Sequence, residues 1–206
     1  FFNYQLQQFA ADRIQLEQEL KYALNNNELE LYYQPIIRLK NRQVVMLEAL
    51  LRWNHPEKGL IRPDQFIDIA EQCGLIIPMG KWVLEQACST IVSALEQGEP
   101  CVPIAINISA KQLTNSEFAK ETQQVLERYE VDPAMIEMEI TESTIMENME
   151  ESLKQLNYLK GLGCRFSIDD FGTGYSSLAQ LKQLPVDTLK IDRSFVRDIE
   201  YDHHDR

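Results

Sequence analysis

Long hydrophobic runs are absent from this sequence, although 44% of its 206 residues are hydrophobic. No apolar segment approaches the ~20 residues that a helix needs to span a bilayer. The first residues, FFNYQLQQF, lack the basic start and apolar centre of a signal peptide, and they look like a cut into a longer chain. We therefore expect no direct membrane insertion of this segment, while a longer parent protein can still be membrane-anchored.

Basic residues are also scarce, with 20 Lys and Arg against 32 Asp and Glu and a formal net charge of −12. Proteins that grip duplex DNA use Lys and Arg to neutralise phosphates, so DNA binding is not expected. A small phosphate-bearing ligand is compatible with this charge only where cations screen it from the acidic groups. The charge balance therefore favours a metal site.

Closely spaced cysteine pairs are missing as well. The four cysteines, Cys73, Cys88, Cys101 and Cys164, include no C-x-x-C pair, and each has apolar neighbours in the sequence. This pattern predicts buried free thiols, which are typical of a reducing compartment. We expect a cytoplasmic location.

The chain divides into a short helix and one sizeable domain. Apolar residues recur at helical spacing between residues 4 and 27, which predicts an N-terminal linker helix in residues 1–27. This helix either packs on its own domain or connects to an upstream signalling module. Residues 28–206 alternate between strand-like and helix-like segments. Strands are expected at residues 29–36, 43–53, 102–109, 136–143, 165–171 and 187–194, and helices at 63–74, 80–98, 116–130, 149–163 and 176–184.

Alternation of strands and helices predicts βα units and a mainly parallel sheet, an α/β fold. Only RLKNR separates the first two strands, which is too short for a helical crossover, so that pair should run antiparallel. The strands fit either an open doubly wound sheet or an incomplete barrel. No G-x-G-x-x-G or P-loop motif follows a strand, which disfavours a nucleotide-binding open sheet.

Strand after strand ends in a group that can bind a cation or a proton. In parallel α/β folds the functional rim lies at these carboxyl ends. Oxygen ligands without His or Cys suit Mg²⁺ or Mn²⁺ rather than zinc. Each residue alone is more often structural than catalytic, and the interpretation depends on their coincidence. The residues are Glu48, Asn107, Glu139, Glu142, Asp169, Asp170, Lys190 and Asp192.

The paired aspartates Asp169 and Asp170 need a bend in the chain. Successive side chains of a strand point to opposite faces, so both cannot face the interior from a regular strand. The glycines and serines that follow, in FGTGYSS, are expected to supply the bend. Such a pair could then contact two metal ions, with one carboxylate shared between them.

With these residues in view, the chain resembles the EAL domain family of bacterial cyclic di-GMP phosphodiesterases. The similarity runs in family order from about residue 28 to residue 196, which makes it highly specific. The matching segments are YYQP at 32–35, EALLRW at 48–53, FIDIAE at 66–71, INIS at 106–109, EITES at 139–143, DDFGTGYSSL at 169–178 and LKIDRSFV at 189–196.

The resemblance implies a modified TIM (β/α)8 barrel with one antiparallel strand. Two further strands of the family, one with an AEGVE-like segment, are absent before the final YDHHDR. An open barrel and an incomplete site are therefore expected in this chain. The resemblance implies that one divalent cation is bound by Glu48, Asn107, Glu139 and Asp169, and that a second is bound by Asp169 and Asp170. It implies that Lys190 orients the attacking water and that Glu142 supports the 169–178 loop. The implied substrate contacts are Gln34, Arg52, Asn107 and Lys190.

The implied reaction is hydrolysis of cyclic di-GMP to linear pGpG with two Mg²⁺ or Mn²⁺ ions. A non-catalytic cyclic di-GMP receptor is the main alternative, and an unrelated Mg²⁺-dependent TIM-barrel lyase or enolase-like enzyme is another. Retention of Glu48, Asp169 and Asp170 favours the enzyme. The family also implies a homodimer and an upstream regulatory domain, either a GGDEF domain or a sensor.

Overall fold

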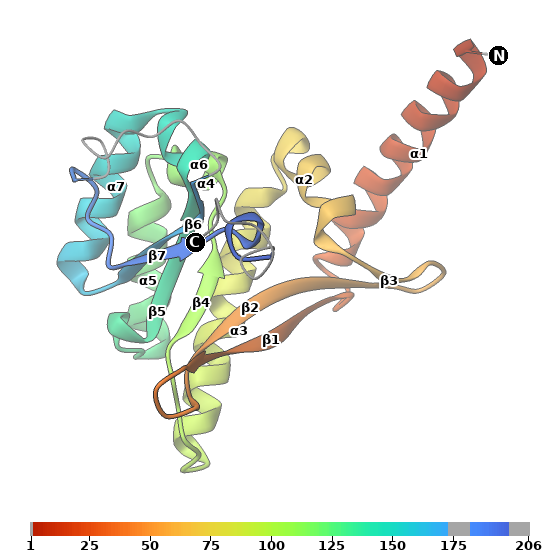
Figure 1. Ribbon diagram of the computed structural model, residues 1–206. Coiled ribbons are helices and arrows are strands. Elements are labelled where there is room, and N and C mark those ends of the chain that lie inside the picture. Colours follow the sequence, from red (N-terminus) through yellow and green to blue (C-terminus); the bar gives the residue numbers. More distant parts are fainter. Residues whose placement is uncertain (1, 173–181, 198–206) are drawn as a thin grey trace.

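The computed structural model describes the backbone of residues 2–172 and 182–197, with side chains from residue 13 onward. Within these residues seven strands form one sheet in the order β1-β2-β4-β5-β6-β7, with β3 paired to β2 (Figure 1). The strands are β1 (Leu29–Arg38), β2 (Gln43–His55), β3 (Gly59–Ile61), β4 (Ile104–Asn107), β5 (Ile136–Thr141), β6 (Arg165–Phe171) and β7 (Thr188–Ile191).

The directions of the strands confirm the expected topology. β1 runs antiparallel to β2, whereas β2, β4, β5, β6 and β7 are successive parallel neighbours. The short β3, which the sequence reading missed, folds back on the end of β2 through a turn at Gly59, where φ is +70°. Glycine adopts this left-handed backbone without a steric penalty, so the turn can be tight.

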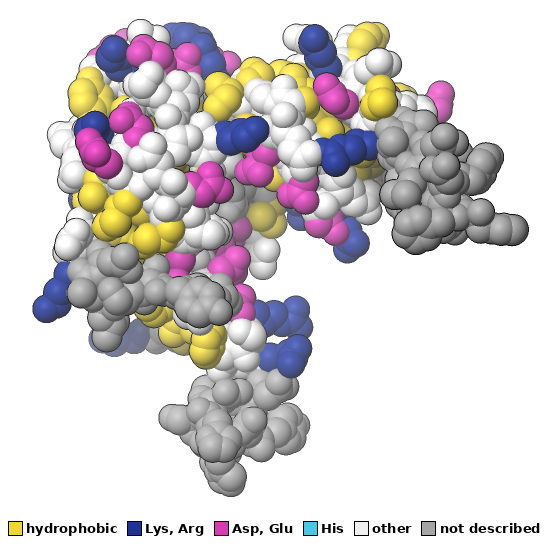
Figure 2. Space-filling model, turned by 90° about the horizontal axis from the view of Figure 1, so that it is seen from above, with side chains coloured by type: hydrophobic (Ala, Val, Ile, Leu, Met, Phe, Trp, Pro, Cys, Tyr) yellow, Lys and Arg dark blue, Asp and Glu magenta, His cyan; other side chains and the backbone are white. Residues whose placement is uncertain are grey.

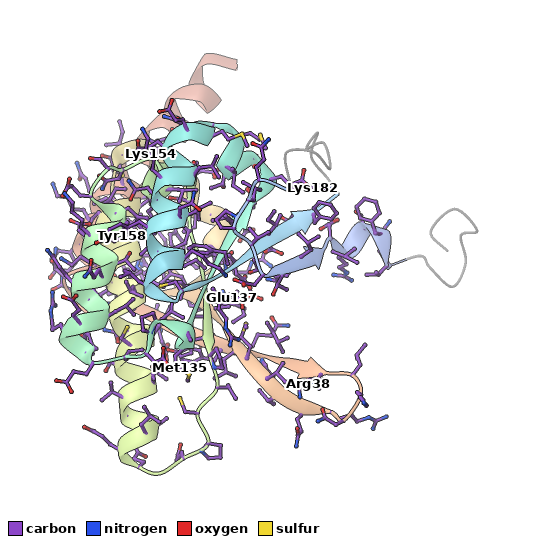
Figure 3. All side chains as sticks on the ribbon, turned by 90° about the vertical axis from the view of Figure 1, so that its left-hand side faces the viewer. Arg38, Met135, Glu137, Lys154, Tyr158 and Lys182 are labelled. Atoms are coloured by element: carbon purple, nitrogen blue, oxygen red, sulfur yellow. The ribbon has the colours of Figure 1, made fainter. Side chains whose placement is uncertain are left out.

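Helices form a layer on one side of the sheet, with α3, α5 and α7 against its outer face (Figure 1, Figure 3). The predicted helices are found with shifted ends, and the 63–74 segment is divided in two at Phe66. The 176–184 segment lies mostly outside the described residues. The helices are α1 (Phe2–Ala23), α2 (Ile67–Cys73), α3 (Ile76–Glu96), α4 (Ala110–Leu113), α5 (Phe118–Tyr129), α6 (Glu142–Met146) and α7 (Met149–Leu162), with 3-10 turns η1 (Pro63–Gln65), η2 (Pro133–Met135) and η3 (Arg193–Phe195).

Two separate clusters of buried side chains hold these layers together. The larger one, here called the sheet core, packs residues such as Met138 and Phe166 of the parallel strands against helix residues such as Leu156 of α7. The smaller one, here called the hairpin core, joins Leu20 of α1 to Trp53 of β2 and their neighbours in α2 and α3. Helix α1 therefore packs on the domain through its last turns, and Figure 1 shows the rest projecting away.

The end of α1 is also fastened by polar contacts to the β2–β3 turn. Glu19 Oε2 lies 3.2 Å from His55 Nε2 and 2.5 Å from Lys58 Nζ. His55 is buried, and its Nδ1 accepts hydrogen bonds from the backbone N–H groups of Glu57 and Lys58, each at 3.1 Å. Its Nε2 is the ring nitrogen that faces Glu19. His55 thus links the β2–β3 turn to the end of α1.

The cysteines are free, but the prediction that all four are buried is wrong for two of them. Cys88 and Cys164 are buried, and burial raises the pKa of these thiols to about 12 and about 11. Cys73 and Cys101 are only partly buried, because one ends α2 and the other lies in the loop before β4. No helix in the described part of the chain is long and apolar enough to cross a membrane.

Candidate active site

The polar residues predicted at the strand ends lie where the parallel strands finish side by side. The strand register places Asn107 of β4 opposite Glu139 of β5, and Thr141 of β5 opposite Asp169 of β6. Glu48 of β2 lies opposite Ala105 of β4, two residues before Asn107. Figure 2 looks down on this end of the sheet and shows acidic side chains gathered over the middle of the molecule.

Lys190 of β7 brings the strand ends together. Its Nζ lies 2.7 Å from Glu139 Oε2, 3.3 Å from Glu48 Oε2 and 3.4 Å from Asp169 Oδ2. Asn107 Nδ2 donates to Glu48 Oε1 at 3.5 Å. These five residues are here called the polar cluster.

The contacts within the polar cluster show that the sheet is curved. β4, β5 and β6 separate β2 from β7 in the strand order, yet Glu48 of β2 and Lys190 of β7 are in contact. In a flat sheet four strand spacings amount to roughly 19 Å, too far for two side chains to meet. The sheet therefore curls around the cluster as an unclosed barrel wall, in agreement with the predicted fold.

The electrostatics of the cluster are dominated by the burial of Glu139, whose side chain is 0% exposed. Burial raises the pKa of Glu139 to about 7, and the charges of Glu48 and Asp169 add to this rise, although Lys190 opposes it. Burial by itself lowers the pKa of Lys190, but contacts with Glu139, Glu48 and Asp169 outweigh this effect and raise it. An ammonium ion thus lies among three carboxylates, and the cluster favours positive charge.

The donor atoms of the cluster suit a hard divalent cation. Carboxylate and amide oxygens are the ligands that Mg²⁺ and Mn²⁺ prefer. Glu139 Oε1 is buried and accepts no hydrogen bond in the described structure, an arrangement that costs free energy unless a cation or water satisfies it. No three His, Cys, Asp or Glu side chains among the described residues enclose a metal position by themselves. Lys190 Nζ occupies the place between the carboxylates that a cation would have to share.

The paired aspartates differ in their surroundings. Asp169 reaches Lys190, whereas the side chain of Asp170 is exposed. The backbone turns at Asp170 itself, where φ is 51°, and the β6–β7 register shifts at the same place. The bend therefore begins before the glycines that the sequence predicts as its source, and Gly172 adds a second positive φ of 101°.

Asp170 has acidic neighbours of its own. Although Asp170 is exposed, partial loss of solvent raises its pKa, and the nearby carboxylates of Asp169 and Asp192 raise it further, with a smaller opposing effect of Lys190. Asp192 is itself the N-cap of η3 and accepts a hydrogen bond from Ser194 N at 2.9 Å. A cation at Asp170 would relieve the repulsion among these groups.

Glu142 is not part of the polar cluster. It is the first residue of α6, which Thr141 caps, and it is buried. Its Oε1 accepts a hydrogen bond from Gly172 N at 3.1 Å, so it fixes the start of the segment that leads out of β6. A Cβ at Gly172 would lie 2.7 Å from the Phe195 ring, so the ring would have to shift, and the φ of +101° also favours glycine here. The predicted role of Glu142 in supporting the 169–178 loop stays a prediction.

Comparison with protein families matches residues 17–206 to the EAL domain. The chain belongs to the EAL domain family. It is 43% identical over 205 residues to "Cyclic di-GMP phosphodiesterase NbdA" of Pseudomonas aeruginosa, covering 100% of this chain and 26% of that protein. It is 40% identical over 198 residues to "Cyclic di-GMP phosphodiesterase PdeR" of Escherichia coli, covering 96% of this chain and 30% of that protein.

A solved structure extends the agreement to the fold of the EAL domain. The PaMucR phosphodiesterase in its c-di-GMP complex superposes with a TM-score of 0.87 at 43% identity, covering 93% of this chain and 77% of that one. This likeness confirms the modified TIM-barrel architecture. The chain spans less than a third of the length of the two curated relatives, both of which are larger proteins.

The two remaining predicted residues of the EAL domain lie on the antiparallel pair β1–β2. Gln34 of β1 is exposed and lies directly opposite Glu48 in the register. Arg52 lies two alternations beyond Glu48 on the same face of β2, so both flank the polar cluster on one side of the sheet. In the described part of the chain no hydrogen bond or ion pair joins either residue to the polar cluster, and their predicted roles toward a ligand stay predictions.

A hollow of ≈ 490 Å³ opens beside Asn107. Sequence reasoning missed it, because it arises where α2 and α3 stand away from the ends of β2, β4 and β5. Its walls are largely apolar with a few polar groups, as is common in small-molecule sites. The walls include Leu51, Pro63, Ile67, Met79, Asn107 and Thr141.

Proposed function

We propose that this EAL domain hydrolyses cyclic di-GMP to linear pGpG. The observation that carries the proposal is the polar cluster, in which Glu48, Asn107, Glu139, Asp169 and Lys190 meet from five strands of one curved sheet. The names of NbdA and PdeR, and the ligand in the PaMucR complex, support the same substrate.

Two divalent cations, Mg²⁺ or Mn²⁺, are part of the proposal. Glu48, Asn107, Glu139 and Asp169 would hold one ion, and Asp169 and Asp170 would hold the other. Such ions supply a hydroxide at neutral pH by lowering the pKa of bound water, and they stabilise charge on the phosphoryl oxygens. The unsatisfied Oε1 of buried Glu139 supports the first position.

The side chains of the domain supply the remaining functions. Lys190 would hold the oxygen of the attacking water through its ammonium group, and it opposes the rise in the pKa of Glu139 that burial causes. Water adds to one phosphorus, the P–O3′ bond breaks, and the freed 3′-oxygen takes up a proton, which opens the ring. Arg52 would bind a phosphodiester oxygen, Gln34 would hydrogen-bond the substrate beside Glu48, and the hollow next to Asn107 would take a guanine.

A receptor that binds cyclic di-GMP without hydrolysis is the second candidate. The specific observation in its favour is that the Lys190 ammonium lies between the carboxylates of Glu48, Glu139 and Asp169, in the place that the first ion would have to share. Incubation of the full-length protein with cyclic di-GMP and Mg²⁺ or Mn²⁺ separates the two, with pGpG measured by chromatography. Tight binding without product would identify the receptor, and the absence of binding would overturn both candidates.

Two variants control this assay. Glu48→Ala and Asp169→Ala each remove a proposed metal ligand, and each should abolish turnover while circular dichroism shows a folded protein.

We also propose, from family membership, a homodimer, control by an upstream GGDEF or sensor domain, and a cytoplasmic location. Residues 173–178 of the 169–178 loop lie outside the described residues.

A further inference from the structure

Arg52 is the cation that faces the proposed substrate without a carboxylate partner. Its Nη1 donates to the backbone oxygen of Leu51 at 2.8 Å, and its guanidinium carbon lies 5.6 Å from the centre of the Tyr32 ring. No ion pair found among the described residues includes Arg52. Both contacts are to neutral groups, so the full positive charge of Arg52 is kept.

The natural partner of Arg52 is occupied elsewhere. Glu30 of β1 lies directly opposite Arg52 in the antiparallel register, the position at which opposite charges ordinarily pair. Its Oε2 instead accepts a hydrogen bond from Asn54 Nδ2 at 2.6 Å. The hairpin therefore carries a carboxylate at the right register but directs it away from the guanidinium.

Tyr32 takes the place that a carboxylate would have. It lies opposite Leu50, which makes it the diagonal neighbour of Arg52 on the same sheet face, within reach of a long side chain. Its side chain is a large hydrophobic group left 45% exposed, so core packing does not account for its presence. The negative face of its ring attracts a guanidinium without neutralising it.

We propose that Tyr32 is a positioning residue, which holds the Arg52 guanidinium in place to bind a phosphodiester of the substrate. This inference rests on the proposed function, in which Arg52 contacts that phosphate. A carboxylate in the same place would hold Arg52 equally well but would compete with the phosphate for it. The aromatic face restricts the guanidinium before the ligand arrives, so less side-chain freedom is lost on binding.

The experiment is a double-mutant cycle on the full-length protein with cyclic di-GMP as the probe. KM and kcat are measured with Mg²⁺ or Mn²⁺, and Kd is measured by calorimetry with the metal omitted. Tyr32→Leu should raise Kd and KM by roughly three- to tenfold with little change in kcat. Tyr32→Phe keeps the ring and should stay within about twofold of the parent.

A matched control is available on another surface. Tyr158 of α7 is 46% exposed, almost the same as Tyr32, and lies in the helical layer on the other side of the sheet (Figure 3). Tyr158→Leu should leave Kd and KM unchanged. A rise as large as that of Tyr32→Leu would mean that any loss of an exposed tyrosine weakens binding, and it would overturn the proposal.

The cycle distinguishes failure of this inference from failure of the proposed function. If Tyr32 acts through Arg52, Tyr32→Leu should change Kd by less than about twofold once Arg52 is already alanine. The same three- to tenfold effect in both backgrounds would overturn the inference alone. No effect of Tyr32→Leu beside a clear effect of Arg52→Ala would do likewise. An Arg52→Ala variant that binds normally would overturn the substrate contact on which both rest.

Discussion

Lys190 and Arg52 are two cations of the EAL domain, and the groups that surround them differ in charge. Lys190 comes from the parallel strands and is surrounded by carboxylates of three other strands, with its side chain 26% exposed. Arg52 comes from the antiparallel hairpin and contacts a carbonyl oxygen and an aromatic ring. The first region is built to concentrate negative charge around a cation, and the second keeps a positive charge available for an anion. A substrate with phosphates bound next to metal ions needs both.

The two regions also rest on different cores. The polar cluster stands over the sheet core, in which each strand is held by parallel neighbours and by α3, α5 or α7. Arg52 directly precedes Trp53, a central residue of the hairpin core, to which the end of α1 contributes Leu20. A displacement of α1 would therefore reach the strand segment that carries Arg52 before the polar cluster.

The largest effect should come from the buried carboxylate of the polar cluster. Glu139→Gln keeps the shape of the side chain but removes the charge that faces Lys190 Nζ at 2.7 Å. We expect kcat/KM for cyclic di-GMP to fall by more than about a thousandfold, or ~4 kcal/mol of transition-state stabilisation. Thermal stability should not fall, because burial of a carboxylate raises its pKa and is unfavourable here. Activity within threefold of the parent would show that Glu139 holds no catalytic ion.

A matched pair of leucines tests whether the two cores are separable. Leu156 of the sheet core and Leu20 of the hairpin core are both 0% exposed. Leu156→Ala should lower the free energy of unfolding by about 3 kcal/mol, because the cavity lies in the shared core of the whole sheet. Leu20→Ala should lower it by only about 1 kcal/mol, because α1 can detach while the sheet stays folded.

Urea unfolding and amide hydrogen exchange measure this difference. In the Leu20→Ala variant, exchange should accelerate in α1 and at the end of β2 but not in β5 or β6. An equal loss of stability in both variants, with exchange accelerated throughout, would contradict the separation and make the domain a single cooperative unit.

Loss of the hydrogen bond between Gly172 and Glu142 should have an intermediate effect on activity. Glu142→Ala removes the acceptor of the Gly172 N–H group, a hydrogen bond to a carboxylate worth about 1.5–3 kcal/mol. We expect roughly tenfold lower kcat with an unchanged fold, because Gly172 follows the aspartates by two residues. Glu142→Gln retains an acceptor oxygen and should recover most of the activity. Equal activities of the Ala and Gln variants would show that this contact does not position the aspartates.

Much of the domain could be predicted from its sequence because the signals are local. Period-2 geometry places Glu48, Asn107 and Glu139 at strand ends, and the short RLKNR connection fixes the direction of the first strand pair. Helices α4 and α6 could not be predicted, since four and five residues are too few to show periodicity. Their starts follow capping residues, Ser109 and Thr141, which were the only available signal.

The missed features of the site depend on relations between strands. The contact between Tyr32 and Arg52 follows from the β1–β2 register, which cannot be read from the sequence. The central position of Lys190 depends on the curvature of the sheet. The turn at Asp170 requires a positive φ at a non-glycine residue, which residue preferences would assign to the neighbouring glycines. Local patterns therefore find the residues, and only the assembled sheet arranges them.

The smallest expected effect concerns pH and the attachment of α1. Burial raises the pKa of Glu19, but hydrogen bonds from Lys58 and Gln15 and the charge of Lys58 outweigh this and lower it below its ordinary value of 4.5. A carboxyl group with a lowered pKa stabilises the folded state above pH 4.5, and this contribution disappears as the pH falls through the lowered pKa.

We expect the free energy of unfolding of the parent to exceed that of Glu19→Gln by less than about 1 kcal/mol at pH 6, since ion pairs near the surface contribute little. The difference should shrink toward zero near pH 3, as measured by urea unfolding followed by tryptophan fluorescence. A difference that stays constant over this range would mean that Glu19 holds α1 by its shape and hydrogen bonds rather than by its charge, and the link between α1 and the Arg52 side would then be insensitive to acid.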